Sequence, residues 1–371
     1  MFAKIGPKFS MSVVEGGTTA VSRALDNVEA KTFKSRDFRL QNGEVLPELK
    51  IAYETYGKLA PDGRNAVLIT HGYTASPHVA GRYKASDPAP GNWDALIGPG
   101  KAIDTERYFV VSSNNLGSSY GSSSPRDIDP ATGKPYGPDF PHHVTLDTIA
   151  AQKLLLEHLG VKHLVAVIGW SYGGGLAFLW GVTYPDFVDA IVPTVSAPVV
   201  QYSPSVIGEL TARLATDPNW NGGRYYENGG IERVLTGIRI ETVKRYGIEA
   251  ELAPRFPDAA AREAEIRRRA EAWAKIFDGN SLIALRRATL GFDAEKDFSK
   301  LRAKVLYVLC TTDLVYPTKL APAVMSKLKA AGVDAEYFEL DSPYGHMAPA
   351  LDAPKWAPTL KRFLNRVSAA K

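Results

Sequence analysis

A serine flanked by glycines is the first feature of the sequence whose residue types and spacing indicate chemistry. The stretch VAVIGWSYGGGLAFLWG contains the pattern Gly-x-Ser-x-Gly, with Ser171 at its centre. The apolar residues before it are typical of a buried strand, and the residues after it indicate a helix. Between a strand and a helix, this pattern forms a tight turn that exposes the serine Oγ, and the glycines allow strand and helix to approach closely. We therefore interpret Ser171 as a nucleophile.

A serine nucleophile needs a base, and the base needs an acid that orients it. After this kind of turn, the acid and then the histidine follow the serine in chain order. Of the seven histidines, only His346 follows Ser171, in the segment DSPYGHMAP. Asp313 comes three residues after the apolar run VLYVLC and is the predicted acid. Asp341 is the alternative acid, but it shares the loop of His346, where we expect it to shape the turn.

Two backbone N–H groups are predicted to stabilise the negative charge that develops on the substrate oxygen. One belongs to Tyr172, next to the serine, and the other to Tyr73, which follows the run AVLITHG. His71 lies in the same loop and is expected to shape it. The other histidines and Cys310 show no spacing typical of a metal site, and GWSYGGG matches no nucleotide-binding loop. We therefore expect neither a metal nor a bound cofactor.

Short apolar runs that alternate with helical patterns predict the elements that position these residues. Such runs are typical of central strands in a parallel sheet that helices cover on both faces. A helical pattern of leucine and isoleucine lies between the second and third runs, at residues 145–160. The alternation favours an open, doubly wound α/β sheet. The predicted strands span residues 65–72, 107–114, 162–169, 188–196, 303–310 and 335–340.

Two segments depart from this alternation and suggest the domain organisation. Residues 1–35 show no clear period and are expected to form an N-terminal extension. Residues 197–300 are rich in charged helical sequence, such as AAAREAEIRRRAEAWAKIF, and contain no convincing strand. We expect this second segment to form a helical lid over the site. The α/β core then comprises residues 36–196 and 301–371.

The composition is that of a globular protein with a large core. The 371 residues include 44 basic and 40 acidic ones without a run of like charge, so the formal net charge is +4. This balance does not favour binding to nucleic acid or to an anionic membrane. The single cysteine excludes an intrachain disulfide, and neither a leader segment nor an apolar stretch long enough to cross a membrane is recognisable. We expect a cytosolic protein.

Several long stretches are specific enough to compare with a known family. Besides the serine turn, they are LPELKIAYETYGKL, NAVLITHGYTASPHVAGRY, WDALIGPGKAIDTERYFVVSSNNLGSSYGSSSP, FPHHVTLDTIAAQKLLLEHLG, DPNWNGGRYY and DSPYGHMAP. From about Phe38 to the C-terminus, the chain resembles the homoserine O-acetyltransferase superfamily of α/β-hydrolases. The resemblance implies the α/β-hydrolase fold, a mostly parallel doubly wound sheet with a helical lid insertion. It also implies a Ser171–Asp313–His346 triad, a homodimer interface formed by the lid, and a covalent acyl-enzyme reached through a narrow tunnel.

The sequence departs from this family where the transferases hold homoserine. They typically carry an aspartate directly after the catalytic histidine to bind the amino group, and this position is Met347 here. In the lid they carry an arginine followed seven residues later by a tyrosine, and we align these two positions with Arg233 and Ile240. An ammonium group beside methionine and isoleucine would lose its hydration without compensation. Homoserine is therefore not an expected acceptor.

Together these residues predict a carboxylic ester hydrolase that acts on short esters, preferably acetyl esters, of a small alcohol. When no alcohol acceptor has a dedicated site, water hydrolyses the acyl-enzyme. The alternative is an O-acyltransferase that uses acetyl-CoA and homoserine or another small hydroxyl acceptor. A third interpretation, a binding module without catalysis, is disfavoured by the complete triad. The expected partners are a small-molecule ester substrate and a second copy of the chain, bound through the lid.

Overall fold

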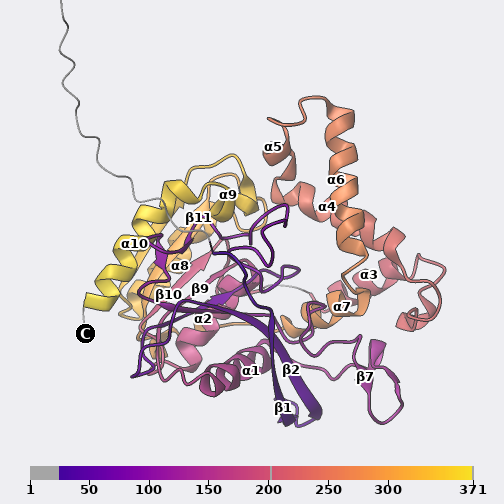
Figure 1. Cartoon of the computed structure of the whole chain (residues 1–371), viewed down its shortest axis with the longest axis horizontal. Helices are drawn as coiled ribbons and strands as arrows, with labels where there is room; N and C mark the ends of the chain where they lie inside the picture. Colours follow the sequence, from indigo (N-terminus) through magenta and orange to yellow (C-terminus); the bar gives the residue numbers. More distant parts are fainter. Residues whose placement is uncertain (1–24, 201–202, 370–371) are drawn as a thin grey trace, which may run out of the picture.

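An eight-stranded sheet forms the centre of the molecule in the computed structural model, which describes residues 25–200 and 203–369 (Figure 1). The strand order is β1-β2-β6-β3-β9-β10-β11-β12. The β1–β2 and β2–β6 pairs are antiparallel, and the other neighbours are parallel. The strands are β1 (Lys31–Arg39), β2 (Val45–Tyr56), β3 (Ala66–Thr70), β6 (Phe109–Ser113), β9 (Leu164–Trp170), β10 (Ala190–Thr194), β11 (Lys304–Cys310) and β12 (Ala335–Leu340).

The six strands from β3 to β12 in this sheet confirm those predicted from the apolar runs. The β1–β2 hairpin is not among them, because its strands alternate buried and exposed residues instead of forming continuous apolar runs. In β1, Phe33 and Phe38 are buried between exposed or partly exposed polar neighbours. Residues 31–35, which the sequence places in the extension, therefore belong to the sheet. Residues 1–24 of that extension lie outside the described residues.

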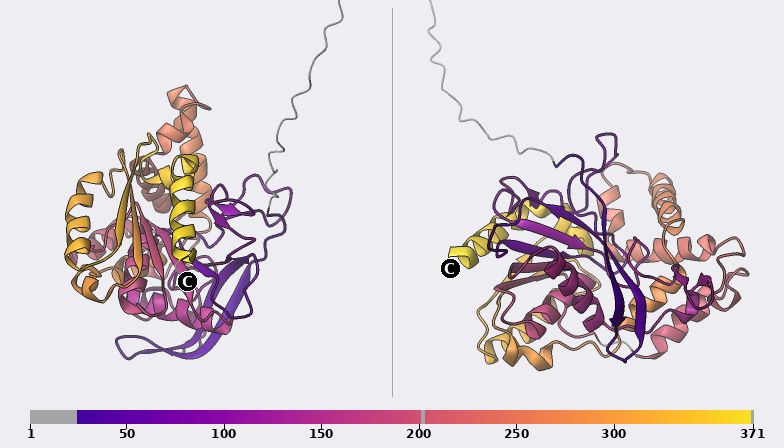
Figure 2. Two further views of the ribbon diagram at one scale, coloured as in Figure 1. Left: turned by 90° about the vertical axis from the view of Figure 1, so that its left-hand side faces the viewer. Right: turned by 60° about the horizontal axis from the view of Figure 1, so that its bottom comes forward.

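Helices cover both faces of the sheet, which divides the core into two halves (Figure 2). Along β3, Leu68 points to one face, whereas Val67 and Ile69 point to the other. The Leu68 side packs against α1, α2 and α8, and the opposite side packs against α10. These helices are α1 (Thr145–His158), α2 (Tyr172–Thr183), α8 (Ala321–Ala330) and α10 (Ala353–Ala369).

A group of helices lies between β10 and β11 in the chain and to one side of the core in Figure 1. Within it, α4 packs along α6. An isolated bridge between Val199 and Asp293 joins the two ends of this segment. The helices are α3 (Ser205–Leu214), α4 (Glu232–Tyr246), α5 (Ile248–Leu252), α6 (Ala259–Ala274) and α7 (Gly279–Ala288).

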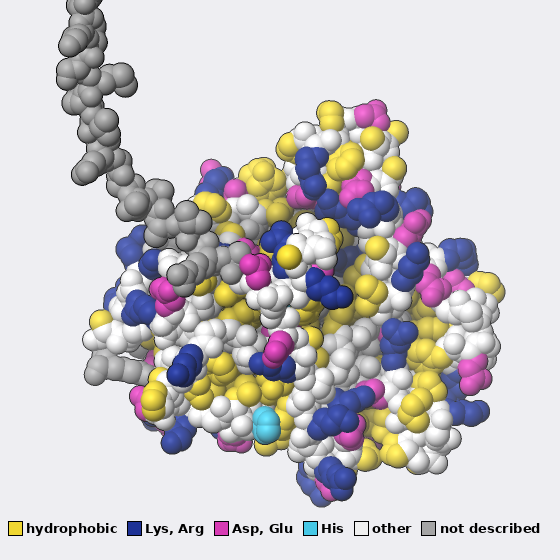
Figure 3. Space-filling view, viewed as in Figure 1, with side chains coloured by type: hydrophobic (Ala, Val, Ile, Leu, Met, Phe, Trp, Pro, Cys, Tyr) yellow, Lys and Arg dark blue, Asp and Glu magenta, His cyan; other side chains and the backbone are white. Residues whose placement is uncertain are grey.

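Two short ribbons and the surface complete the description. The ribbons pair β4 (Ile97–Gly98) with β5 (Ile103–Asp104) and β7 (Ile128–Asp129) with β8 (Lys134–Pro135). On the face shown in Figure 3, basic and acidic side chains are interspersed. No helix within residues 25–200 and 203–369 is both long and apolar enough to cross a membrane.

Candidate active site

Ser171 lies in a strained turn between β9 and α2, as the sequence pattern predicts. Its backbone angles are φ 56° and ψ −122°, a combination that non-glycine residues rarely adopt. The turn is tight because β3 lies directly beneath it. A Cβ on Gly173 would lie 1.9 Å from the Thr70 carbonyl oxygen, and a Cβ on Gly169 would lie 2.2 Å from Thr70 Oγ1. The two glycines are therefore required by close packing.

Neighbouring strand ends hold the backbone of Ser171 in this conformation. Its N–H donates to the Thr194 carbonyl at 3.0 Å, and its own carbonyl accepts from Ser196 Oγ at 2.7 Å. Thr70 Oγ1 donates to the Gly173 carbonyl at 2.8 Å. Contacts on both sides of the serine thus compensate for the strain, which lets the turn fix the direction of the Oγ.

His346 and Asp313 come from two adjacent strand ends and meet beside the serine. His346 lies after β12 in the short helix Gly345–Met347, and Asp313 lies three residues after β11. Both side chains are buried, and Nδ1 of His346 is 2.9 Å from Oδ2 of Asp313. The other carboxylate oxygen accepts the Val315 N–H at 2.7 Å. Asp341 is exposed and accepts from Thr311 Oγ1 at 3.3 Å.

The hydrogen bond to Asp313 determines which imidazole nitrogen can act as a base. With Nδ1 as the donor to the carboxylate, Nε2 carries the free lone pair. Nε2 is buried and makes no hydrogen bond among the described residues. The imidazole packs against the rings of Tyr246 and Tyr316, with centroids 4.6 Å and 5.9 Å away. This arrangement suits proton transfer to and from a group bound beside Ser171.

Ser171 stands at the junction of two cavities of about 400 and 440 Å³. Tyr73 and Tyr246 also line both cavities. Among the described residues, His346 lines the first cavity and not the second, whereas Tyr172 lines the second and not the first. His346 and the residue after the serine therefore face different spaces. We call these spaces the histidine-side cavity and the helix-side cavity.

The residues of the two predicted N–H donors, Tyr73 and Tyr172, both line the helix-side cavity beside the serine. Tyr172 is the first residue of α2, so its N–H is one of the groups that have no acceptor within the helix. Tyr73 lies in the loop after β3, where its hydroxyl donates to the Leu282 carbonyl in α7. His71, in the same loop, is fully buried with Nε2 3.0 Å from Asn114 Oδ1, and burial lowers the pKa of this histidine to about 4. His71 is consequently neutral near pH 7.

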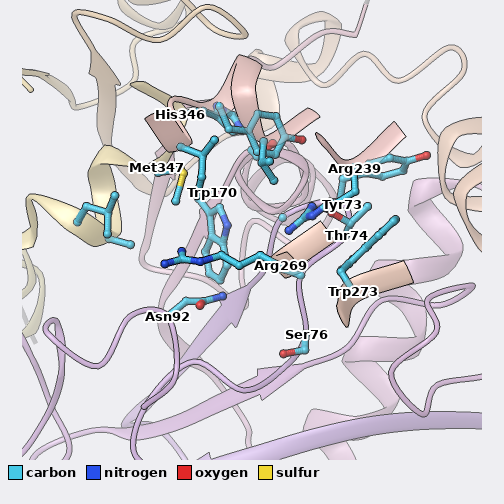
Figure 4. Close-up of a pocket in the computed structure, with 18 of the residues that line it drawn as sticks. Tyr73, Thr74, Ser76, Asn92, Trp170, Arg239, Arg269, Trp273, His346 and Met347 are labelled. Carbon is cyan, nitrogen blue, oxygen red and sulfur yellow. Dashed lines mark hydrogen bonds between the residues drawn. The ribbon is translucent and has the colours of Figure 1, made fainter. Parts of the chain in front are cut away.

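The structure does not place Arg233 at this site. Its side chain is 73% exposed and forms an ion pair with Asp217 at 3.6 Å. The arginine of α4 that lines the histidine-side cavity is Arg239 (Figure 4). Six residues at 3.6 residues per turn separate the two positions by about 120° around the helix, so the two side chains face different directions. Arg233 therefore does not line this cavity, contrary to the expectation from the sequence.

Arg239 is a cation without a counter-charge in the described part of the chain. Its guanidinium donates to Thr74 Oγ1 at 3.0 Å and lies 4.9 Å from the centre of the Trp273 ring. No described carboxylate lies within 4 Å, and burial lowers the pKa of Arg239. The uncompensated charge is poised to bind an anionic group in the cavity.

The second lid position expected from the sequence does not line the site either. Ile240 is not among the residues that line either cavity, and it packs in a small apolar cluster that Met347 also contacts. Tyr246 lies seven residues after Arg239 and lines both cavities. The segment RIETVKRY carries this spacing, which is the signal that could have identified the pair. Met347, by contrast, lines the histidine-side cavity as expected.

Residues able to hold a metal are not gathered at this site. Within the described ranges, no group of three or more His, Cys, Asp or Glu side chains could hold a metal ion. Cys310 is buried at the end of β11, with Sγ 3.5 Å from the Ser342 carbonyl oxygen.

The class of protein follows from the sheet, the serine turn and their match to a known fold. Residues 65–238 match the α/β hydrolase fold family. Homoserine O-acetyltransferase of Symbiobacterium thermophilum is 37% identical over 353 residues, which cover 89% of this chain and 92% of the relative. The chain therefore belongs to the homoserine O-acetyltransferase family of α/β-hydrolases.

Two solved structures resemble this chain equally well but have different activities in their names. Homoserine O-acetyltransferase from Bacillus anthracis is 30% identical, with a TM-score of 0.83 and coverage of 91% of this chain and 98% of that one. Esterase E22 is also 30% identical, with a TM-score of 0.83 and coverage of 91% and 100%. The fold is thus common to a transferase and an esterase, and the reaction has to be inferred from the site.

Proposed function

We propose that this protein transfers a short acyl group, through a covalent intermediate on Ser171, to the hydroxyl group of a small acceptor. In the first half-reaction, Ser171 Oγ attacks the acyl carbon while His346 Nε2 accepts its proton. The N–H groups of Tyr172 and Tyr73 stabilise the oxyanion, and Asp313 stabilises the imidazolium. His346 then gives the proton to the leaving group as its bond to the acyl carbon breaks.

The second half-reaction reverses these steps with a new hydroxyl group. The acceptor oxygen attacks the acyl carbon, its proton passes to His346, and Ser171 Oγ leaves and takes the proton back. Both the leaving group and the acceptor have to lie within hydrogen-bonding distance of Nε2. Since His346 lines the histidine-side cavity, these groups bind there, and the acyl group extends into the helix-side cavity.

The observation that carries this proposal is the uncompensated cation Arg239 in the cavity that receives the acceptor. A carboxylate on the acceptor would supply the missing counter-charge through charge-assisted hydrogen bonds. The names of the transferase relatives support acetyl transfer, the reaction type of the alternative interpretation of the sequence, better than hydrolysis. Met347, however, offers no charge to an ammonium group. The acceptor is therefore a hydroxy acid without an amino group beside Met347.

Hydrolysis is the second candidate function, because the likeness to esterase E22 and the apolar Met347 both favour it. In that case water replaces the acceptor, and His346 activates it as a base. Both functions form the acyl-enzyme on Ser171, and they differ in whether water or an acceptor hydroxyl group takes the acyl group from it.

Thiol release from acetyl-CoA with different acceptors distinguishes these functions. 4-Hydroxybutyrate, which is homoserine without its amino group, is expected to stimulate release and to yield its acetyl ester, whereas homoserine is expected to stimulate it much less. If thiol release in buffer alone is as fast as in the presence of 4-hydroxybutyrate, the protein is a hydrolase. Strong preference for homoserine would contradict the acceptor class, and the Ser171→Ala variant gives the background rate.

Replacing Met347 by aspartate is predicted to create an acceptor site for homoserine. Arg239 and Tyr246 already line the cavity, so this one change supplies the missing counter-charge for the ammonium group. Charged hydrogen bonds contribute about 1.5–3 kcal/mol, which corresponds to a gain of roughly 10- to 100-fold in kcat/KM for homoserine. The Met347→Asn variant, of similar shape without the charge, is the control. An equal gain in both variants would show that charge is not the cause.

A further inference from the structure

The histidine-side cavity has an aromatic wall that neither half-reaction uses. Trp170, the residue before Ser171, lines this cavity together with Trp273 and Met347 (Figure 4). Trp170 directly precedes the serine in the turn GWSYGGG. The two indole rings and the thioether are large, weakly hydrated side chains, and Figure 4 shows Trp170 and Met347 on one side of the cavity and Trp273 on the other.

The two indole rings are held in place by packing on their other sides. Trp170 stacks on Trp93, with ring centroids 4.7 Å apart and an angle of 24° between the planes. Trp93 is itself fully buried against the edge of Trp356. Trp273 stacks on Phe277 in the lid at 4.8 Å and 15°. Rigid rings lose little conformational freedom when a ligand binds, so the wall is preorganised.

The charge and the aromatic wall lie next to each other. The guanidinium of Arg239 rests on the ring of Trp273, and Arg269 reaches into the same cavity from α6 (Figure 4). Arg269 forms ion pairs with Glu251 and Glu265 at 3.1 and 2.8 Å, whereas Arg239 has no such partner among the described residues. A carboxylate bound to Arg239 would therefore lie beside the indole ring of Trp273.

We infer that the acceptor is a hydroxy acid that carries an aromatic ring, with its carboxylate on Arg239 and its ring against Trp170 and Trp273. This inference rests on the proposed acyl transfer and specifies its acceptor. A cavity of about 400 Å³ has room for a ring of this kind, since it falls within the usual range for small-molecule sites.

Four acceptors separate the contribution of the ring from that of the carboxylate. They are 3-phenyllactate, lactate, 1-phenylpropan-2-ol and propan-2-ol, which share one secondary hydroxyl and differ only in phenyl and carboxylate groups. p-Nitrophenyl acetate serves as the donor, and the acetylated product of each acceptor is measured. We expect kcat/KM for 3-phenyllactate to exceed that for lactate and that for 1-phenylpropan-2-ol by at least tenfold each. Equal rates for 3-phenyllactate and lactate would overturn the inference.

Substitutions of Trp170 and Arg239 test whether these residues determine the preference for an acceptor with a phenyl ring and a carboxylate. Trp170→Leu is expected to lower the 3-phenyllactate-to-lactate ratio at least fivefold, mainly through KM, and Trp170→Phe is expected to restore most of it. Arg239→Leu is expected to lower the ratio of 3-phenyllactate to 1-phenylpropan-2-ol instead. Trp220→Leu is the control, because Trp220 is a lid indole that lines neither cavity. A ratio unchanged by Trp170→Leu would contradict the inference.

The acyl-enzyme itself provides the separate check on the proposed function. A burst of p-nitrophenolate equal to the enzyme concentration, absent in Ser171→Ala, reports formation of the acetyl-enzyme. If the burst occurs and the four acceptors do not differ, the aromatic inference fails and acyl transfer stands. If no burst occurs and acetyl-CoA releases no thiol, both proposals fail.

Discussion

At the scale of single residues, the site combines a common reacting group with an uncommon binding surface. Ser171, His346 and Asp313 are positioned by strand ends, and Asp313 orients the imidazole of His346. Met347 and Trp170 place apolar side chains in the histidine-side cavity, which Ser171 also lines. In the proposed reaction, the chemistry and the choice of acceptor depend on different residues.

Substitutions of Asp313 and Asp341 test which of the two aspartates orients His346. Asp313→Asn should lower kcat by about 10³- to 10⁴-fold, because an amide at this position favours the wrong imidazole tautomer. Asp341→Asn should change kcat by less than about threefold, since surface substitutions away from the site have small effects. Both variants are compared in steady-state hydrolysis of p-nitrophenyl acetate, with circular dichroism as the folding control. The opposite ranking would move the acid to the loop of the histidine.

At the scale of elements, two packing arrangements create the site. The β9–α2 turn depends on the close approach of α2 to β3, and α4 turns Arg239 and Tyr246 toward the cavity because positions seven apart share one face of a helix. Tyr73 in turn connects the loop after β3 to α7. The helices between β10 and β11 thus carry Arg239 and Tyr246, whereas the strand ends carry Ser171, His346 and Asp313.

Glycine-to-alanine changes test the packing of the serine turn. Gly173→Ala should reduce the free energy of unfolding by about 3 kcal/mol, the upper end of overpacking effects, because the new Cβ would collide with the backbone of Thr70. Gly208→Ala in α3 meets no atom within 4 Å and should instead stabilise the protein by about 0.5–1 kcal/mol. Urea denaturation measures both. Similar effects of the two changes would show that the turn is not tightly packed.

At the scale of the whole molecule, two buried histidines connect stability to pH. His71 and His143 are fully buried, and burial lowers the pKa of each to about 4. The unfolded chain therefore binds more protons than the folded protein between about pH 4 and 6.5. Their contribution to stability is complete above about pH 6.5 and is lost as the pH falls toward 4.

The contribution of one histidine to this pH dependence can be measured by comparing variants with the unmodified protein. The free energy of unfolding should fall with decreasing pH in this window, by up to about 1 kcal/mol per pH unit for each histidine. His143→Gln should remove its share of the slope, whereas His158→Gln, at an exposed position on α1, should leave the slope unchanged. Urea denaturation from pH 4.5 to 7 provides the values. Parallel slopes for His143→Gln and the unmodified protein would contradict the assignment.

Local sequence patterns are sufficient to predict the central strands, the strained turn at Ser171 and the pairing of His346 with Asp313 rather than Asp341. These patterns are continuous apolar runs for buried strands, paired glycines for a close approach, and chain order for residues at strand ends. They do not predict the β1–β2 hairpin, because an edge hairpin with one exposed face carries a mixed pattern. Local patterns also do not distinguish Arg233 from Arg239. Both arginines lie on one amphipathic helix, and which of its faces meets the serine depends on how that helix packs against the core, which no local pattern records.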